Sequence, residues 1–172
     1  MPIILGVDPG SRMTGYGVVR LDGSQLTHLD SGAIAIAGKS IGERLNCIFK
    51  ELSTIVKQWT PEVAAVEQVF MHLNPGGAIK LGQARGAAIV AAASLGLQTA
   101  EYSARQIKQS VTGHGGADKL QVQQMVARLL HLELPLQNDA ADALAVAICH
   151  AHTNQSLSRL GGAKGIRNGR LQ

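Results

Sequence analysis

The spacing of apolar and polar residues divides this chain into short strands and amphipathic helices. Residues Ile3 to Val7 form a continuous apolar run, which is typical of a strand buried on both faces. Two more strands are predicted at Tyr16 to Leu21 and His28 to Ile36. The turn residues Asp22-Gly23-Ser24 lie between them, so the first three strands are expected to form an antiparallel meander.

The strongest helix prediction covers Ser40 to Trp59, where apolar residues recur every three or four positions. Ser40 and Glu43 form a capping-box signature at its start, and Pro61 closes it. The same signals predict a strand at Val63 to Val66, a helix at Gly77 to Leu95, a strand at Leu97 to Tyr102, helices at Ser103 to Val111 and Asp118 to His131, and a last helix from its cap Asn138 to about His152. This order indicates an α/β fold, with helices on both faces of a mixed sheet.

Length and composition narrow the class of protein. A chain of 172 residues suggests one domain, and 45% hydrophobic with 16% charged residues excludes a disordered chain. No apolar run reaches the roughly 20 residues of a membrane span, and the N-terminus lacks the basic region of a signal peptide. Two cysteines, Cys47 and Cys149, cannot form a disulfide framework. We therefore expect a soluble, cytoplasmic protein.

The charge is unevenly distributed along the chain. Residues 1–152 contain 12 Lys and Arg and 12 Asp and Glu, so the formal net charge of +4 lies entirely in residues 153–172. That segment is rich in glycine and has no apolar period, which predicts a flexible basic tail behind a domain at 1–152. Within the domain, residues 68–131 carry six basic and two acidic residues. This excess suits a polyanionic partner, although scattered solvated charge explains it equally well.

Four acidic residues stand at positions where ligands commonly bind. Asp8 and Glu67 each follow a predicted buried strand and precede a turn or loop, and open α/β sheets bind ligands at the carboxyl ends of their strands. Asp139 and Asp142 lie three residues apart in the first turn of the last predicted helix, so both project from one face. The amino end of a helix also favours their ionised forms.

Four carboxylates close to apolar elements repel one another unless a cation neutralises them. Oxygen ligands without a supporting Cys or His cluster favour a hard ion, Mg²⁺ or Mn²⁺. Helix-terminus charge is the structural alternative for Asp142, and a capping role is the alternative for Asp139. Asp8 and Glu67 are harder to explain by structure alone. The convergence of all four on one site is an inference from these placements.

One segment resembles the opening strand and turn of the RuvC family, the bacterial Holliday junction resolvases of the ribonuclease H-like superfamily: Ile4-Leu5-Gly6-Val7-Asp8-Pro9-Gly10-Ser11-Arg12-Met13-Thr14-Gly15-Tyr16-Gly17. Three later segments resemble further motifs of that family, in its order: Val66-Glu67-Gln68-Val69-Phe70, Lys80-Leu81-Gly82-Gln83-Ala84-Arg85-Gly86 and Asp139-Ala140-Ala141-Asp142-Ala143-Leu144-Ala145. The resemblance covers about residues 3 to 150, and it is specific as a set.

The resemblance implies a ribonuclease H-like fold with a five-stranded mixed sheet, its first three strands antiparallel, and a homodimer. It implies a metal-dependent endonuclease that resolves Holliday junctions by paired symmetric nicks in DNA recombination and repair, with a RuvA–RuvB branch-migration complex as partner. The catalytic, metal-binding carboxylates of the family correspond to Asp8, Glu67, Asp139 and Asp142. Some family members have a histidine where Asp139 stands.

The chemistry of phosphodiester hydrolysis suits these residues independently. The reaction needs an activated water and a stabilised leaving oxygen, and two metal ions about 4 Å apart supply both without a protein nucleophile. We expect two Mg²⁺ ions per subunit, with Mn²⁺ as a substitute. Asp8 is the best candidate to bridge the ions, with Glu67 on one and Asp142 on the other. Asp139 would orient or deprotonate the water.

Four side chains are expected to contact DNA. By resemblance, Lys108 and Lys119 lie near the scissile strand and Phe70 contacts bases near the crossover. Arg85 belongs to the basic excess of residues 68–131. An exposed Phe70 would stack on an unpaired base, and a buried core phenylalanine is the alternative. Each lysine taken alone is equally well explained as a solvated helix residue.

Weaker signals point to other sites. Residues 32–40 resemble a phosphate-binding loop, but five residues separate the two glycines where the motif needs four. Cys149, His150 and His152 could ligate a metal, although the end of a helix favours histidine without one. His114 lies in a glycine-rich loop and is interpreted as solvent-exposed.

Three other functions compete with junction cleavage. An actin-like ATPase or sugar kinase shares a similar acidic phosphate turn, but such proteins generally need two domains of this kind. A non-catalytic DNA-binding module conflicts with four carboxylates placed near phosphate. A related nuclease acting on RNA stays open, because nothing in the sequence reads the 2′-hydroxyl. Mg²⁺-dependent cleavage of a branched DNA would separate the first function from these.

Overall fold

The computed structural model describes residues 1–69, 75–159, 166–167 and 170–171. Its centre is a five-stranded sheet in the order β3-β2-β1-β4-β5. The first three strands pair antiparallel, whereas β4 and β5 run parallel to β1. The strands are β1 (Ile3–Asp8), β2 (Met13–Asp22), β3 (Gln25–Ala35), β4 (Val63–Glu67) and β5 (Gln98–Tyr102). The predicted mixed sheet with an antiparallel meander at its start is confirmed.

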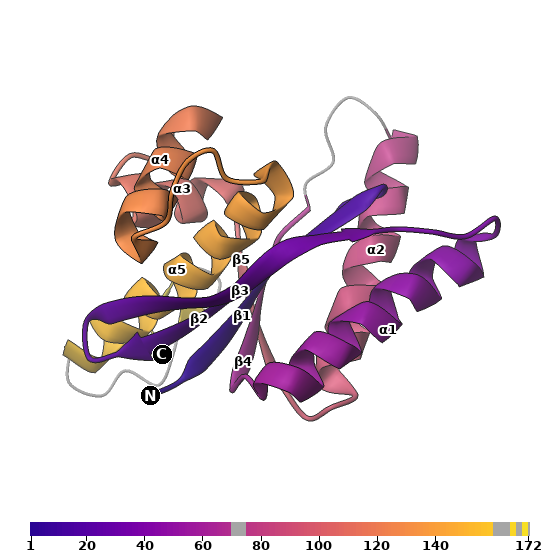
Figure 1. Cartoon of the computed structure of the whole chain (residues 1–172), viewed down its shortest axis with the longest axis horizontal. Helices are drawn as coiled ribbons and strands as arrows, with labels where there is room; N and C mark the ends of the chain where they lie inside the picture. Colours follow the sequence, from indigo (N-terminus) through magenta and orange to yellow (C-terminus); the bar gives the residue numbers. More distant parts are fainter. Residues whose placement is uncertain (70–74, 160–165, 168–169, 172) are drawn as a thin grey trace.

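Helices cover both faces of this sheet (Figure 1). They are α1 (Ile41–Trp59), α2 (Pro75–Ala93), α3 (Ala104–Thr112), α4 (Lys119–Leu130) and α5 (Asn138–Arg159). Helices α1 and α2 bury one apolar cluster against the sheet, and α3, α4 and α5 bury a second cluster on the opposite face. Successive apolar side chains of the strands therefore point to opposite faces of the sheet, and each face packs against its own group of helices.

Two predicted helix caps, Ser40 and Ser103, are confirmed, and the helix predicted to start at Asp118 has that residue as its cap. Ser40, Ser103 and Asp118 each accept a hydrogen bond from a backbone N–H of the first turn, in complete capping boxes. The predicted cap of α5 at Asn138 was wrong. The backbone N–H groups of Ala140 and Ala141 donate instead to Gln137, at 2.7 Å to its side-chain oxygen and 2.9 Å to its carbonyl. The Asn138 side chain is engaged elsewhere, because it accepts from Gln123 Nε2 of α4 at 2.7 Å.

The last helix is longer than its predicted end at His152, because α5 continues to Arg159. Beyond it, β6 (Ile166–Arg167) and β7 (Arg170–Leu171) form a short antiparallel pair. The flexible character of residues 153–172 stays a prediction. Among the described helices, none combines the length and apolar character needed to cross a membrane.

Helix α5 lies unusually close to the sheet because glycines of β1 and β2 face it, Gly6, Gly15 and Gly17 among them. A Cβ atom on Gly6 would lie 2.1 Å from the carbonyl oxygen of Ala143, and one on Gly15 would lie 2.0 Å from the carbonyl oxygen of Asp139. No side chain fits at either position, so the helix backbone rests directly on β1 and β2. This contact fixes the height of the first turn of α5 above the carboxyl end of β1.

Candidate active site

Asp8 and Glu67 end two adjacent parallel strands. Val7 of β1 pairs with Val66 of β4, and in each strand the next residue is the carboxylate. Burial of the apolar residues before them holds both strand ends in place. The prediction that these two side chains share one edge of the sheet is confirmed.

Asp139 and Asp142 reach the same edge through the packing of α5. Asp8 pairs with Gly15 across β1 and β2, and Gly15 contacts the backbone of Asp139. Figure 1 shows the amino end of α5 at the upper end of the sheet, where β4 also ends. The structure therefore brings all four predicted carboxylates into one neighbourhood, where their charges influence one another.

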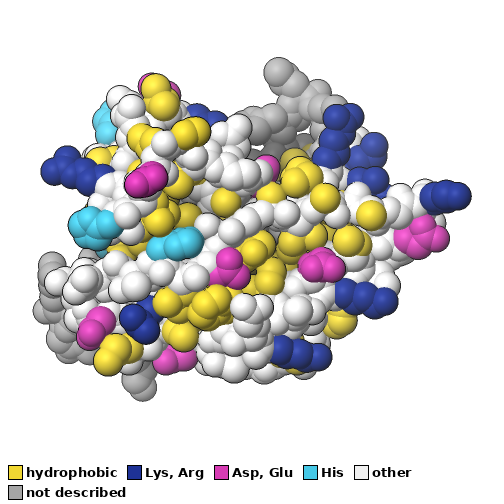
Figure 2. Space-filling model, viewed as in Figure 1, with side chains coloured by type: hydrophobic (Ala, Val, Ile, Leu, Met, Phe, Trp, Pro, Cys, Tyr) yellow, Lys and Arg dark blue, Asp and Glu magenta, His cyan; other side chains and the backbone are white. Residues whose placement is uncertain are grey.

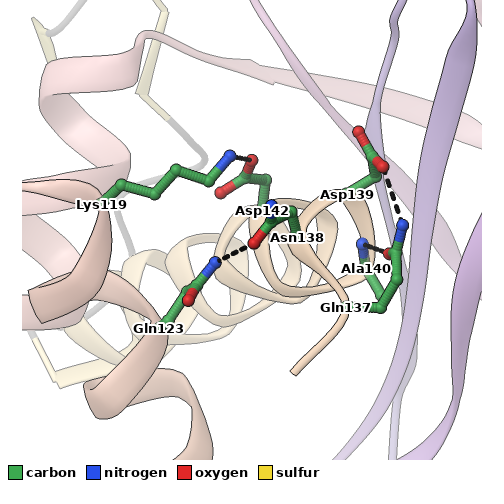
Figure 3. Close-up of polar contacts among 7 residues, drawn as sticks. All are labelled: Lys119, Gln123, Gln137, Asn138, Asp139, Ala140 and Asp142. Atoms are coloured by element: carbon green, nitrogen blue, oxygen red, sulfur yellow. Dashed lines mark hydrogen bonds and ion pairs between the residues drawn. The ribbon is translucent and has the colours of Figure 1, made fainter. Parts of the chain in front are cut away.

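Each aspartate of α5 has a different hydrogen-bond partner (Figure 3). Lys119 Nζ, at the start of α4, donates to Asp142 Oδ2 at 2.7 Å. Gln137 Nε2 donates to Asp139 Oδ2 at 2.8 Å. The two carboxylates start from one turn of the helix but are held by groups that lie on opposite sides of that turn.

The electrostatic environment disfavours a full set of negative charges. Burial, followed by the charges of Glu67, Asp142 and Asp139, raises the pKa of Asp8 to about 8, although Lys119 opposes the shift. Asp8 consequently retains its proton near neutral pH in the metal-free protein, where an ordinary aspartate is ionised.

Burial and the charge of Asp142 also raise the pKa of Glu67, while a hydrogen bond with the Asp8 side chain and the charges of Lys108 and Lys119 lower it. A protonated Asp8 donating to an ionised Glu67 accounts for this pattern, since two carboxyl groups at one site share a proton in this way. The pair thus offers a place where a cation would replace a proton.

The side chains of the site are not arranged as a ready coordination sphere in the described part of the chain. Across the described residues, no three His, Cys, Asp or Glu side chains are positioned to hold a metal ion. Lys119 donates to one oxygen of Asp142, and Gln137 donates to one oxygen of Asp139. The donor set itself fits a hard cation, since it consists of carboxylate oxygens and already attracts the ammonium group of Lys119.

The predicted DNA-contact residues lie on different elements. Phe70 falls outside the described residues. Lys108, on α3, and Lys119, on α4, lie on the side of the carboxylates and affect the pKa of Glu67. Arg85, on α2, forms an ion pair with Glu101 of β5 at 2.6 Å. Arg85 would therefore have to leave Glu101 before it could meet a phosphate.

The histidine and cysteine residues of α5 do not form a metal site in the described structure. Cys149 is buried in the core. His150 lies 2.8 Å from the Tyr102 hydroxyl, and His152 lies 3.2 Å from the Ser110 hydroxyl. These contacts join α5 to β5 and α3. His114 is exposed in its loop, as predicted.

Sequence reasoning missed two features of the site, namely Gln137 and the glycine contacts that seat α5. Glutamine is not among the preferred capping residues, so its position before the helix gave no signal. The glycines carried a usable signal: Gly15 follows the acidic turn directly, and a strand glycine often marks close approach of another backbone.

The comparisons with known proteins agree with this geometry. Residues 4–150 match the family model described as crossover junction endodeoxyribonuclease RuvC. A protein of that name from Marinobacter nauticus is 58% identical over 100% of this chain and 99% of its own length. One from Acinetobacter baumannii is 60% identical over 93% of this chain and 88% of its own.

A solved structure, Thermus thermophilus RuvC in complex with Holliday junction substrate, shares the fold with a TM-score of 0.85. It is 33% identical, and the match covers 91% of this chain and 96% of that one. The matched residues 4–150 include all four carboxylates, the seating glycines and the strand order that unites them. The chain belongs to the family of the crossover junction endodeoxyribonuclease RuvC.

Proposed function

We propose that this chain is an endonuclease that resolves Holliday junctions by paired, symmetric, metal-dependent nicks, with Asp8, Glu67, Asp139 and Asp142 as its catalytic carboxylates. The observation that carries the proposal is the meeting of these four groups at one end of the sheet in a member of this family. A relative bound to Holliday junction substrate supports the choice of DNA.

Mg²⁺ is the proposed cofactor, at two ions per subunit, with Mn²⁺ as a substitute. Asp8 would bridge the two positions because it has both Glu67 and the α5 aspartates as neighbours. Glu67 would complete one position and Asp142 the other. The bound ions would activate a water molecule and stabilise the leaving oxygen of the phosphodiester.

The chain's own residues prepare this site. Asp8 and Glu67 would hold the cation as ionised carboxylates, so the proton that Asp8 shares with Glu67 would pass to solvent. Asp139, with Oδ2 held by Gln137, would use Oδ1 to orient or deprotonate the attacking water. The closely seated α5 holds both aspartates at a constant height above the strand ends.

Lys119 has two successive roles in this proposal. In the metal-free protein its ammonium group neutralises Asp142. Its side chain is 57% exposed, so it is free to turn toward a phosphate when DNA binds. Lys119→Met should then slow junction cleavage by about tenfold, as expected for one phosphate contact near the reacting group. Unchanged cleavage would leave Lys119 with its structural ion pair only.

Other proposed DNA contacts come from Lys108, Arg85 and Phe70. Figure 2 shows Lys and Arg side chains gathered where the amino end of α2 lies in Figure 1. A surface of this kind binds phosphates without reading sequence. Arg85→Gln should weaken junction binding by less than about threefold, since Nη2 of Arg85 already pairs with Glu101 and the side chain is only 23% exposed.

The exposed face of α2 is the proposed homodimer interface. The inner face of this helix, including Ala84 and Ala88, is buried in the core. The outer face presents Ile79 and Val90, which are 62% and 56% exposed. A second copy fits this face because it is apolar, and because two symmetric nicks require two equivalent active sites.

The double substitution Ile79→Glu and Val90→Glu should convert the dimer to a monomer in sedimentation experiments. Ile41→Glu is the control, since Ile41 is also exposed and apolar but lies on α1. The monomeric variant should lose paired nicking. A dimer that survives the double substitution would exclude α2 as the interface.

Cleavage of a synthetic four-way junction and of a matched linear duplex, with Mg²⁺ and with EDTA, tests the function directly. Paired nicks that appear only in the junction and only with Mg²⁺ are expected. Tight junction binding without cleavage would favour the non-catalytic module, and ATP hydrolysis would favour the actin-like enzymes. An RNA junction in the same assay tests the remaining alternative, a nuclease that acts on RNA.

A cytoplasmic location and a RuvA–RuvB branch-migration partner also belong to the proposal.

A further inference from the structure

We infer that Gln137 is a positioning residue for catalysis, because its one amide group both caps α5 and orients the carboxylate of Asp139. The inference rests on the proposed role of Asp139 in the reaction. It concerns a residue outside the four carboxylates, on the loop that leads into α5.

The capping contact determines which way the amide points. The backbone N–H of Ala140 can only donate, and it lies 2.7 Å from Gln137 Oε1. The oxygen of the amide must therefore face the helix, because an amide nitrogen in its place would meet another donor. The backbone carbonyl of Gln137 accepts from Ala141 at 2.9 Å, which anchors the residue at the helix start.

The opposite atom of the same amide holds Asp139. Because Oε1 accepts from the backbone of the helix, the NH₂ group points the other way and donates to Asp139 Oδ2 at 2.8 Å (Figure 3). A hydrogen bond to an ionised carboxylate is shorter and stronger than one between neutral groups. The carboxylate is consequently held by one oxygen, and its other oxygen is available to the water or the cofactor.

The two contacts together couple the helix to the carboxylate. Gly15 fixes where the backbone of Asp139 lies, and Gln137 fixes which way its side chain turns. An aspartate at position 137 would cap the helix as well, but it would turn a repelling oxygen toward Asp139. Glutamine supplies an acceptor and a donor on one planar group, which explains a residue type that is otherwise a poor cap.

Two substitutions separate the cap from the positioning contact. Gln137→Ser keeps a good capping oxygen but is too short to reach the Asp139 carboxylate as the glutamine does. Gln137→Glu keeps the length and the capping oxygen but replaces the donor by a repelling carboxylate oxygen. Both variants should unfold within about 2 °C of the parent protein, since the cap remains.

The expected losses concern chemistry and metal binding. With a saturating four-way junction, kcat should fall about tenfold in Gln137→Ser and further in Gln137→Glu, as for other outer partners of metal ligands. The concentration of junction at half-maximal rate should stay within about twofold, because no phosphate contact is removed. Binding of Mn²⁺ without DNA, followed by its paramagnetic resonance signal, should weaken by about tenfold.

Two controls make the outcome decisive. Gln123→Met removes the neighbouring amide bond between α4 and Asn138, and should leave both kcat and Mn²⁺ binding unchanged. Asp139→Asn tests the premise, because an active Asp139→Asn would overturn the proposed role of Asp139 itself. If Asp139→Asn is inactive while both Gln137 variants retain parental kcat and Mn²⁺ affinity, then Gln137 is only a helix cap and the inference is wrong.

Discussion

At its amino end, α5 places Asp139 and Asp142 beside two further carboxylates, whereas about 16 Å further along the same helix His150 lies between Tyr102 and Asn154. Both regions contain polar groups at the boundary between α5 and the sheet. In the first region burial and the like charges of the neighbouring carboxylates raise the pKa of Asp8, which therefore holds a proton. In the second region each group finds a complementary partner within the fold.

Both ring nitrogens of His150 have a hydrogen-bond partner within the fold. Its Nδ1 lies 2.8 Å from the Tyr102 hydroxyl and its Nε2 lies 2.9 Å from Asn154 Nδ2. The amide nitrogen of Asn154 can only donate, so Nε2 of the neutral imidazole accepts from it and the Nδ1–H group donates to the Tyr102 hydroxyl. Burial lowers the pKa of His150 to about 4, so the ring stays neutral.

The difference teaches how to separate function from stability on one helix. Polar groups that only stabilise the fold are paired internally, whereas groups that bind an ion and a reacting water are left in an unfavourable arrangement. Lys119 and Gln137 pair with the two aspartates of α5, but burial and the neighbouring carboxylates still raise the pKa of Asp8, so under the proposed function a bound cation would relieve the remaining repulsion. The following experiments test this contrast, beginning with the largest effect.

Asp8→Asn should reduce junction cleavage by about 1,000-fold, equivalent to about 4 kcal/mol, because it removes the proposed bridging ligand. Junction affinity should stay near the parental value, since no basic residue changes. Asp22→Asn is the matched control, because Asp22 is an exposed aspartate at the end of β2. Cleavage that survives Asp8→Asn would place Asp8 among the stabilising groups instead.

His150 should make the protein less stable in acid. Its pKa is about 4 in the folded protein and near 6.5 when unfolded, so the unfolded chain binds more protons between these values. Stability should therefore rise from pH 4 to pH 6.5, by about 3 kcal/mol from this one group. Urea unfolding of the parent and of His150→Gln measures the difference, which should narrow in acid.

Asp8 should have the opposite pH dependence in the metal-free protein. Its pKa is raised from 3.8 to about 8 on folding, so its contribution to stability is largest in acid and is lost as pH rises toward 8. In EDTA near pH 8, Asp8→Asn should therefore be more stable than the parent protein, because asparagine carries no charge that burial disfavours. Added Mg²⁺ should reverse that order. A destabilised Asp8→Asn in EDTA would mean that Asp8 is already satisfied without metal.

Tyr102→Phe gives the smallest expected effect. It removes one hydroxyl from the His150 contacts and should cost about 1 kcal/mol of unfolding free energy while leaving junction cleavage unchanged. Tyr16→Phe is the matched control on the other face of the sheet, where the hydroxyl is 3.5 Å from Asp30 and contributes less. A loss of cleavage in Tyr102→Phe would show that the contacts of His150 influence the carboxylates at the amino end of α5.

Much of this protein could be predicted from local sequence. Strands appeared as short apolar runs, and Asp8 and Glu67 stood out because an acid followed each run directly. Ser40 with Glu43 predicted the start of α1, since a capping box satisfies backbone donors within a few residues. Such signals are local, because both partners of each contact lie close together in the chain.

Only the tertiary structure decided how distant residues meet. Lys119 pairs with Asp142, Arg85 pairs with Glu101, and Gln137 replaces the expected cap at Asn138. Asn138 was a reasonable cap by residue type, but its side chain bonds to α4 because that helix packs beside it. The sequence alone determined which carboxylates stand at strand and helix ends. Packing of α5 on a glycine-lined sheet decided that they share one site, because backbone approach depends on contacts between segments far apart in the chain.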